Sequence, residues 1–479
     1  MRKTKIVCTI GPATRSEETI KELIKAGMNV ARLNFSHGSH EYHLGTIEMI
    51  KKVRKELDCP LAILLDTKGP EIRTKSLKDS KPVVLQKDNN FLLTTRDIEG
   101  DEKEVSITYK SLPQQLFIGT TVLIDDGKIK LTVEQINNDT DIICKINRGG
   151  ELGEKKGINI PGINIDMPYL NENDKADILF GIENDVDFIA ASFVRTKNDV
   201  TDLRKFINYN SGHDIKIISK IENMEGVDNF DEILRNSDGI MIARGDMGVE
   251  VEFEKLPGLQ KRFIKKCYQS GKMVITATQM LESMIKNPTP TRAEITDVAN
   301  AVFDGTSAIM LSGETAMGEY PIKAVKVMAK IAQQAEKDSF DMSFYSNISY
   351  EMDEHDSTNA VCDAACTMAR DIHAKAIIAP TMGGNTVRNM SKFRPYQPIV
   401  ASTPKEKTFN QLALSWGVYP VMARYQHTSD DLFLHAIDCA KMIDIVEDGD
   451  LVVIAAAMPL ELQSNTNILK VEVVGNKKR

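Results

Sequence analysis

A lysine and two carboxylates stand at the ends of two successive apolar runs. Lys220 and Glu222 are two residues apart in the segment 218–226, so they share one face of a strand. Asp246 follows the next apolar run, in the turn Ala243-Arg244-Gly245-Asp246. Mg²⁺ usually takes one or two carboxylates together with substrate oxygens. The spacing predicts that Glu222 and Asp246 bind a divalent metal beside Lys220, and a buried Lys–Glu ion pair is the alternative.

Polar residues also stand at the ends of two earlier apolar runs. Arg32, Asn34 and Ser36 alternate, so the period of two places them on one face as the chain leaves the strand. Asp66 and Thr67 end the following run. The oxygens of Asn34, Ser36, Asp66 and Thr67 indicate a site for a monovalent cation, although an Asp-Thr pair after a strand is also a common helix N-cap.

Two further strand ends face the same region. Gly245 allows close backbone approach beside Asp246, and N–H groups at a following helix start suit a carboxylate or a phosphate. Thr278 is in phase to face the same mouth, and Ser312 and Glu314 follow the last run. Threonine in a strand is usually structural, so only its position singles out Thr278.

Histidines give no metal motif. His37, His40 and His43 match no zinc spacing, and Mg²⁺ prefers oxygen to imidazole. We expect His40 and His43 to be surface residues of a helix.

The elements that must position these residues are short apolar runs alternating with amphipathic helical patterns, as in βα units. Eight runs recur, at 5–10, 29–35, 62–67, 187–193, 216–222, 239–244, 273–279 and 308–312. This pattern predicts a (β/α)₈ barrel, the TIM barrel, whose active site lies at the carboxyl ends of the strands. We assign residues 1–68 and 167–342 to this catalytic A domain.

The third and fourth runs are separated by more sequence than one helix needs, which indicates an insertion. Residues 69–166 are rich in alternating β patterns, and an Asp126-Gly127 turn joins the runs 121–125 and 128–136. We expect a small antiparallel β-barrel, the B domain. It is well placed to act as a lid that excludes water, and a passive insertion is the alternative.

A third region follows the polar stretch 336–357, which we interpret as a linker. Five apolar runs, at 375–379, 398–402, 417–423, 451–456 and 469–474, alternate with helical patterns. We expect residues 343–479 to form an open α/β C domain.

Composition excludes several classes of function. The 479 residues carry 60 Lys+Arg against 68 Asp+Glu, a formal net charge of −8, which argues against bulk attraction to nucleic acid or an anionic membrane. The seven cysteines are scattered along the chain, which argues against a framework of disulfide bonds. The apolar run near the amino terminus is too short for the hydrophobic part of a signal peptide, and no later stretch reaches the roughly 18 uninterrupted apolar residues that a membrane-spanning helix needs. We expect a cytoplasmic protein.

The chain resembles the pyruvate kinase family through nearly its whole length. The motifs that carry the resemblance are TKIVCTIGP (4–12), NVARLNFSHG (29–38), LLDTKGPEIR (64–73), ISKIENMEG (218–226), GIMIARGDMGV (239–249), TATQMLESM (276–284) and LSGETAMG (311–318). The family implies the same three domains. It also implies transfer of the phosphoryl group of phosphoenolpyruvate to ADP, giving pyruvate and ATP, the final step of glycolysis.

The resemblance implies roles for individual residues. Glu222 and Asp246 would bind Mg²⁺ or Mn²⁺, while Asn34, Ser36, Asp66 and Thr67 would bind K⁺, and Glu71 matches the acidic residue that accompanies K⁺ dependence. Arg32 would contact the transferring phosphoryl group, and Lys220 would stabilise its charge. The substrate carboxylate would meet Ala243, Arg244, Gly245 and Asp246. Thr278 would line the face where the enolate is protonated, with Ser312 and Glu314 as members of a proton relay. Asn34, His37 and Arg73 match residues near the nucleotide.

The resemblance also implies a homotetramer and a phosphorylated allosteric effector. The C-domain segment Thr381-Met382-Gly383-Gly384-Asn385-Thr386 follows a strand and starts a helix, a geometry suited to phosphate. It aligns with the family's effector loop, so Thr381, Gly383, Gly384, Asn385 and Thr386 are candidates. A helix cap in a domain that serves assembly is the alternative.

Two other functions remain open at this point. One is a Mg²⁺-dependent lyase or aldolase acting on a pyruvate enolate, which would have no use for Lys220, Arg32 or the K⁺ ligands. The other is a catalytically silent protein that binds phosphosugars, which predicts lesions among the metal and phosphoryl ligands, and the sequence shows none.

Overall fold

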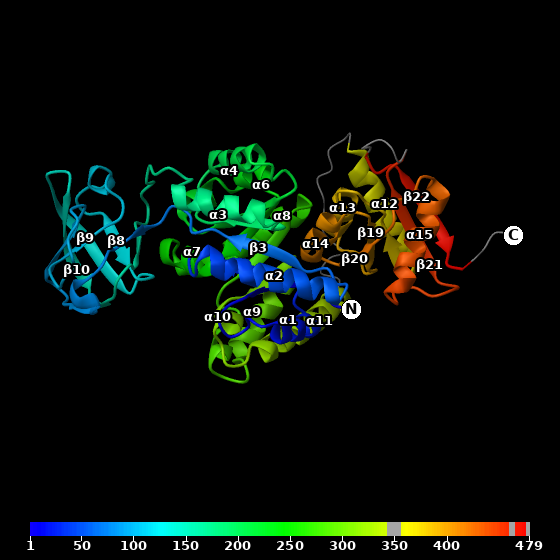
Figure 1. Cartoon of the computed structure of the whole chain (residues 1–479), viewed down its shortest axis with the longest axis horizontal. Coiled ribbons are helices and arrows are strands. Elements are labelled where there is room, and N and C mark those ends of the chain that lie inside the picture. Colours follow the sequence, from blue (N-terminus) through cyan, green and yellow to red (C-terminus); the bar gives the residue numbers. More distant parts are fainter. Residues whose placement is uncertain (343–355, 459–464, 476–479) are drawn as a thin grey trace.

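The computed structural model describes residues 1–342, 356–458 and 465–475. It is elongated, with the inserted β module at one end, the barrel in the middle and the C-terminal α/β region at the other end (Figure 1). The amino terminus lies between the barrel and the C-terminal region.

Eight parallel strands close into the predicted barrel, in the order β1-β17-β16-β15-β14-β13-β3-β2. Their bounds are β1 Lys5–Thr9, β2 Val30–Asn34, β3 Ala62–Asp66, β13 Phe188–Ala191, β14 Lys216–Ile221, β15 Gly239–Ala243, β16 Met273–Ala277 and β17 Ala308–Leu311. Alternate strand residues such as Val7, Leu64 and Ile218 fill the interior, while their neighbours Ile6, Leu65 and Ile217 pack against the helices. This alternation is the period of two expected for a closed sheet, and the (β/α)₈ prediction is confirmed.

Helices surround the barrel. They are α1 Glu17–Ala26, α2 His40–Glu56, α3 Glu172–Glu183, α4 Lys197–Tyr209, α5 Met224–Asp228, α6 Phe230–Asn236, α7 Arg244–Glu250, α8 Leu256–Gln269, α9 Arg292–Phe303, α10 Gly313–Ala316 and α11 Pro321–Asp341. Local sequence fixes several starts. Ser16 caps α1 by accepting from the Thr19 N–H, and Thr291 with Glu294 forms a capping box on α9.

The inserted module has its own apolar core, which includes Phe91, Leu131 and Ile142. Its strands are β4 Ile72–Arg73, β5 Val83–Leu85, β6 Asn90–Thr94, β7 Glu104–Ser106, β8 Thr121–Ile124, β9 Ile129–Asn137, β10 Asp141–Arg148, β11 Gly150–Leu152 and β12 Gly157–Asn159. Seven of them form one sheet in the order β4-β12-β8-β9-β10-β6-β7. An antiparallel bridge between Thr74 and Ile107 joins its two edges.

The predicted module differs from the structure in one respect. The Asp126-Gly127 turn joins β8 and β9 as an antiparallel pair, as expected, but β6 and β7 pair in parallel. The sheet is therefore mixed and not wholly antiparallel. The alternation of apolar residues determines which face of a strand is buried, and it does not determine the direction of the neighbouring strand.

In the described part of the C-terminal region, five strands form an open sheet with helices, in the order β20-β19-β18-β21-β22, and only the β21–β22 pair is antiparallel. Its elements are α12 Ser357–Asp371, β18 Ala376–Ile378, α13 Asn385–Lys392, β19 Ile399–Thr403, α14 Glu406–Gln411, β20 Val418–Met422, α15 Ser429–Met442, β21 Leu451–Ala456 and β22 Ile468–Val473. All five predicted runs are strands. The polar stretch 336–357 is not entirely a linker, because α11 continues to Asp341; its residues 343–355 lie outside the described residues.

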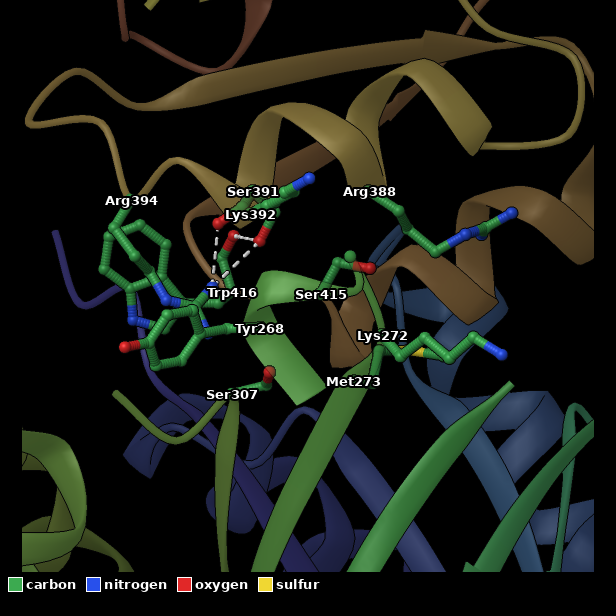
Figure 2. Close-up of a pocket in the computed structure, with 11 residues that line it drawn as sticks. Tyr268, Lys272, Met273, Ser307, Arg388, Ser391, Lys392, Arg394, Ser415 and Trp416 are labelled. Carbon is green, nitrogen blue, oxygen red and sulfur yellow. Dashed lines mark hydrogen bonds between the residues drawn. The ribbon is translucent and has the colours of Figure 1, made fainter. Parts of the chain in front are cut away.

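The barrel and the C-terminal region meet through a polar junction at the start of β1. Lys5 Nζ donates to the Val418 carbonyl (2.5 Å), and Gly417 N–H donates to the Lys3 carbonyl (3.0 Å). A cavity of about 10 Å³ lies nearby. Figure 2 shows Tyr268 and Ser307 of the barrel around it, together with Ser391 and Trp416 of the C-terminal region. Hydrogen bonds to backbone carbonyls therefore join the barrel to the C-terminal region at this junction.

Candidate active site

Lys220 lies at the centre of the barrel mouth, near the end of β14. Its Nζ is 3.0 Å from Glu222 Oε1 and 3.1 Å from Asp66 Oδ1, and it donates to Ser192 Oγ at 2.8 Å. Only 8% of the residue is exposed. Burial by itself would lower the pKa of Lys220, but Asp66 and Glu222 outweigh it and raise the pKa above the ordinary value. The ammonium therefore stays charged in a water-poor site.

Arg32 on β2 supplies a second buried cation. Its Nε donates to Asp66 Oδ2 (2.6 Å) and its Nη1 to Thr9 Oγ1 (2.9 Å). Burial would raise the pKa of Asp66, but Arg32 and Lys220 together lower it. Asp66 is thus a carboxylate that fixes two cations side by side, an arrangement suited to a multiply charged anion.

Glu222 lies directly after β14, and Asp246 lies in the first turn of α7, which follows the adjacent strand β15. Glu222 is 1% exposed, and its Oε2 accepts the Phe193 N–H at 2.6 Å. Burial raises the pKa of the Glu222 carboxyl; Lys220 opposes this change, and the Asp246 charge adds to it. Two carboxylates whose charges repel each other are a donor set that fits Mg²⁺, because a divalent cation favours their ionised forms.

The remaining predicted cation ligands lie at the ends of β2 and β3. Asn34 and Asp66 are paired neighbours in the register of these strands, and Asn34 Oδ1 accepts the Ser36 N–H at 3.1 Å. Thr67 Oγ1 lies 3.3 Å from the Ala190 carbonyl. The donor set consists of oxygens, as K⁺ requires, while both Asp66 oxygens also contact Arg32 or Lys220.

Thr278 supports the turn that carries Asp246. Its Oγ1 accepts the Gly245 N–H at 2.8 Å and donates to the Ala277 carbonyl at 2.6 Å. Its φ of +69° is unusual for a β-branched residue. The Arg244 side chain instead pairs with Asp297 at 2.7 Å and donates to the Thr278 carbonyl. Within this turn, the Arg244 guanidinium holds the backbone in place.

A cavity of about 490 Å³ separates the barrel mouth from the inserted module. His37, Arg73 and Asp246, all predicted site residues, line it. The side chain of Asn159 on β12 donates to Glu250 Oε1 of α7 (3.1 Å), which ties the module to the barrel across this cavity. The space is large enough for a nucleotide-sized ligand and lies between the two parts.

Two predicted residues, Ser312 and Glu314, have mainly supporting contacts. Glu314 is 1% exposed, and its two oxygens accept the N–H groups of Leu281 (3.0 Å) and Ser312 (2.7 Å). These contacts join the loops after β16 and β17. Burial raises the pKa of Glu314.

His43 was expected at the surface, and this is wrong. It is buried, stacks on Phe35 with ring centroids 4.0 Å apart, and donates from Nε2 to the His37 carbonyl (2.8 Å). The first turn of α2 lies over the end of β2, which helical periodicity alone does not show. His40 is exposed and pairs with Asp177 at 2.6 Å.

The C-terminal candidate residues surround a second cavity of about 520 Å³. Thr381, Gly383, Asn385 and Thr386 line it together with Lys405, Arg424 and His435. Gly384 is not a lining residue. It takes a φ of +81° at the start of α13 and donates its N–H to Thr381 Oγ1 (2.9 Å), which shapes the loop.

Sequence reasoning missed the end of β13. Ser192 contacts Lys220, and Phe193 N–H contacts Glu222, although the run 187–193 was identified as a strand. A serine directly after buried Ala190 and Ala191 was the available signal. The contribution of Phe193 is a backbone group, which no side-chain pattern shows.

Comparison with known proteins gives a consistent result. The family model described as pyruvate kinase, barrel domain, matches residues 1–325, and that described as pyruvate kinase, alpha/beta domain, matches residues 359–472. A pyruvate kinase of Clostridium acetobutylicum is 49% identical over 476 residues, covering 99% of this chain and 100% of that protein. Pyruvate kinases of Staphylococcus haemolyticus and Staphylococcus aureus are each 48% identical over 477 residues, which is 99% of this chain and 81% of theirs. The chain therefore belongs to the pyruvate kinase family.

Proposed function

We propose that the barrel mouth transfers the phosphoryl group of phosphoenolpyruvate to ADP, giving pyruvate and ATP. The chain is a phosphotransferase by its family. The observation that supports this site most strongly is Lys220, a buried ammonium between Asp66 and Glu222 at 3.1 and 3.0 Å. A lyase or aldolase acting on the enolate, or a silent phosphosugar-binding protein, is not favoured by the family assignment.

Phosphoryl transfer depends mainly on positioning and on neutralising charge. Arg32 and Lys220 are both held by Asp66, so they need little reorganisation when the substrate arrives. We assign Arg32 to the phosphoryl oxygens of the bound substrate. Lys220 stabilises the charge that builds on the group as it leaves the enolate oxygen for ADP.

Mg²⁺ or Mn²⁺ fits Glu222 and Asp246, and K⁺ fits Asn34, Ser36, Asp66 and Thr67. Bound there, these cations would supply positive charge next to the phosphoryl oxygens, which two polyanionic substrates need inside a chain of net charge −8. Glu71, whose Oε2 lies 2.5 Å from Arg73 Nε, is the residue that we connect with dependence on K⁺.

The turn from Ala243 to Asp246 receives the substrate carboxylate. Thr278 holds this turn through Gly245 and lines the face on which the enolate takes up a proton. Glu314 is better suited to holding Leu281 and Ser312 than to carrying a proton, because each of its oxygens accepts a backbone N–H.

The nucleotide lies in the cavity beneath the inserted module, near Asn34, His37 and Arg73. The module acts as a lid in this proposal, because its residues 156–160 and 162–165 line one side of the cavity and the barrel lines the other. Excluding water from the cavity favours transfer to ADP over hydrolysis.

The wider assignments are also proposals. The chain divides into A (1–68 and 167–342), B (69–166) and C (343–479) domains, forms a homotetramer and works in the cytoplasm. None of the helices in the described part of the chain is long and apolar enough to span a membrane. The C-terminal cavity, with Lys405 and Arg424 beside Thr381, Gly383, Asn385 and Thr386, binds a phosphorylated effector.

The test is an assay of pyruvate formation from phosphoenolpyruvate and ADP by the purified chain, coupled to lactate dehydrogenase. Activity that requires both substrates and Mg²⁺ supports the proposal. Breakdown of phosphoenolpyruvate without ADP, or no turnover with Mg²⁺ and K⁺ present, would contradict it.

A further inference from the structure

One arginine of the barrel holds the second connection to the inserted module, residues 160–170. Arg195 donates from Nη1 to the Ile165 carbonyl (3.0 Å) and from Nη2 to the Met167 carbonyl (2.9 Å). Asp199, in the first turn of α4, lies 3.3 Å from the guanidinium and also accepts the Arg195 N–H at 2.9 Å. The arginine thereby fixes two backbone positions of the connection at once.

The residues just before Arg195 contact the reacting groups. Ser192 Oγ accepts from Lys220 Nζ (2.8 Å), and the Phe193 N–H donates to Glu222 Oε2 (2.6 Å). Phe193 has a φ of +53°, in the left-handed region that bulky residues rarely adopt. Such a conformation persists only where the surroundings hold it in place, and here contacts on both sides do so.

The first connection, residues 67–71, packs on the same segment. Gly69 has a φ of +76°, and a Cβ there would lie 2.9 Å from Ser192 Cβ and from the Ser192 carbonyl oxygen. That carbonyl accepts from the Tyr169 hydroxyl of the second connection (3.0 Å). Both connections therefore meet at residues 192–195, within four residues of chain that also contact Lys220 and Glu222.

We propose that Arg195 is a positioning residue that couples the placement of the inserted module to Lys220 and Glu222 through Ser192 and Phe193. A rotation of the module moves the carbonyls of Ile165 and Met167, and Arg195 passes that movement to the Phe193 N–H. The Glu222 carboxylate, whose Oε2 accepts this N–H, shifts with it. The inference rests on the proposed function, because that function assigns phosphoryl transfer to the barrel mouth that contains Lys220 and Glu222.

The test compares Arg195→Met with a matched control. Arg204 lies on α4, the helix that follows Arg195; it donates to the Ile215 carbonyl (3.1 Å) and pairs with Asp238, but it serves the opposite end of the barrel. Hydrogen–deuterium exchange without substrate follows peptides covering 160–170, 188–195 and 216–222. Steady-state kinetics with phosphoenolpyruvate and ADP give kcat and KM for each variant.

We expect Arg195→Met to speed exchange in all three peptides and to lower kcat about 10–100-fold, since a small misplacement of reacting groups costs that much. Arg204→Met should leave kcat within about twofold and exchange at 160–170 unchanged. Arg195→Lys keeps the positive charge but loses the two guanidinium nitrogens that donate to separate carbonyls, so it should recover part of the loss in kcat. If Arg195→Met folds poorly, Arg195→Lys is judged by the same criteria.

Faster exchange confined to 160–170, with kcat unchanged, would overturn the coupling, and so would equal effects of the Arg195 and Arg204 variants. These outcomes are distinct from failure of the proposed function, because exchange is measured without substrate. An inactive wild-type chain whose exchange still responds to Arg195→Met would contradict the function and leave the coupling supported.

Discussion

Replacing Lys220 by methionine removes the buried ammonium and keeps the length of the side chain. The structure loses three contacts of 2.8–3.1 Å, to Ser192, Glu222 and Asp66. Loss of one preorganised donor at a developing charge typically costs about 3–4 kcal/mol, which is about 10²–10³ in kcat. The cost here lies at the upper end or beyond, because Asp66 and Glu222 also lose a cation that offsets their charges.

Two assays on the same protein separate the steps. Pyruvate formation from phosphoenolpyruvate and ADP reports phosphoryl transfer, and Mg²⁺-dependent proton exchange at the pyruvate methyl group reports enolate chemistry. We expect Lys220→Met to lower the first by at least about 10²–10³-fold and to leave the second measurable. Parallel loss of both in a folded variant would show that Lys220 has no selective role in phosphoryl transfer.

A control lies on the same strand. Lys216, at the other end of β14, has its Nζ 3.8 Å from Asp238, far along the strand from the barrel mouth. Lys216→Met should change kcat by no more than about twofold, because this half-buried ion pair lies at the end of the strand away from the reacting groups. A Lys220→Met enzyme with wild-type turnover would refute the assignment.

Three further outcomes follow from the site and the junction. Replacing K⁺ by a large organic cation should lower kcat at least about tenfold; full activity without K⁺ would contradict the role given to Glu71. Thr278→Val should slow proton exchange on pyruvate about 10²-fold, the usual contribution of a positioned proton-transfer group, and slow phosphoryl transfer less; an unchanged exchange rate would remove Thr278 from that step. Burial lowers the pKa of Lys5 to about 7 from 10.5, so between these pH values the unfolded chain binds a proton that the folded chain does not. The free energy of unfolding of the wild type, relative to that of Lys5→Met, should therefore increase between about pH 7 and pH 10, by up to about 1.4 kcal/mol per pH unit. Thermal scans should show the difference in melting temperature increasing in the same direction, and a pH-independent difference would contradict this.

The sequence was sufficient for the barrel because its eight apolar runs are bounded by turn residues and separated by helix-length intervals. Residues at the ends of those runs, such as Lys220 and Asp66, could be placed at the mouth by strand direction alone. Strand direction does not predict the contacts of Phe193 and Arg195. Phe193 uses a backbone N–H in a left-handed conformation, and Arg195 contacts the carbonyls of the distant residues 165 and 167.

Other differences have the same origin. His43 is buried because α2 packs its first turn on Phe35, a tertiary contact that the periodicity of the helix does not encode. The parallel pairing of β6 with β7 depends on how residues 95–103 return the chain. The Asn159–Glu250 contact joins two parts far apart in sequence.

The central claim is that the barrel mouth moves a phosphoryl group directly from phosphoenolpyruvate to ADP. Phosphorus NMR of the wild-type chain with both substrates, Mg²⁺ and K⁺ tests it most directly, with Glu222→Gln measured alongside. We predict that ATP appears in a one-to-one ratio with the phosphoenolpyruvate consumed, and that Glu222→Gln, folded to the same thermal midpoint within a few degrees, forms ATP at least about 10²-fold more slowly. Inorganic phosphate in place of ATP, or wild-type ATP formation by Glu222→Gln, would contradict it.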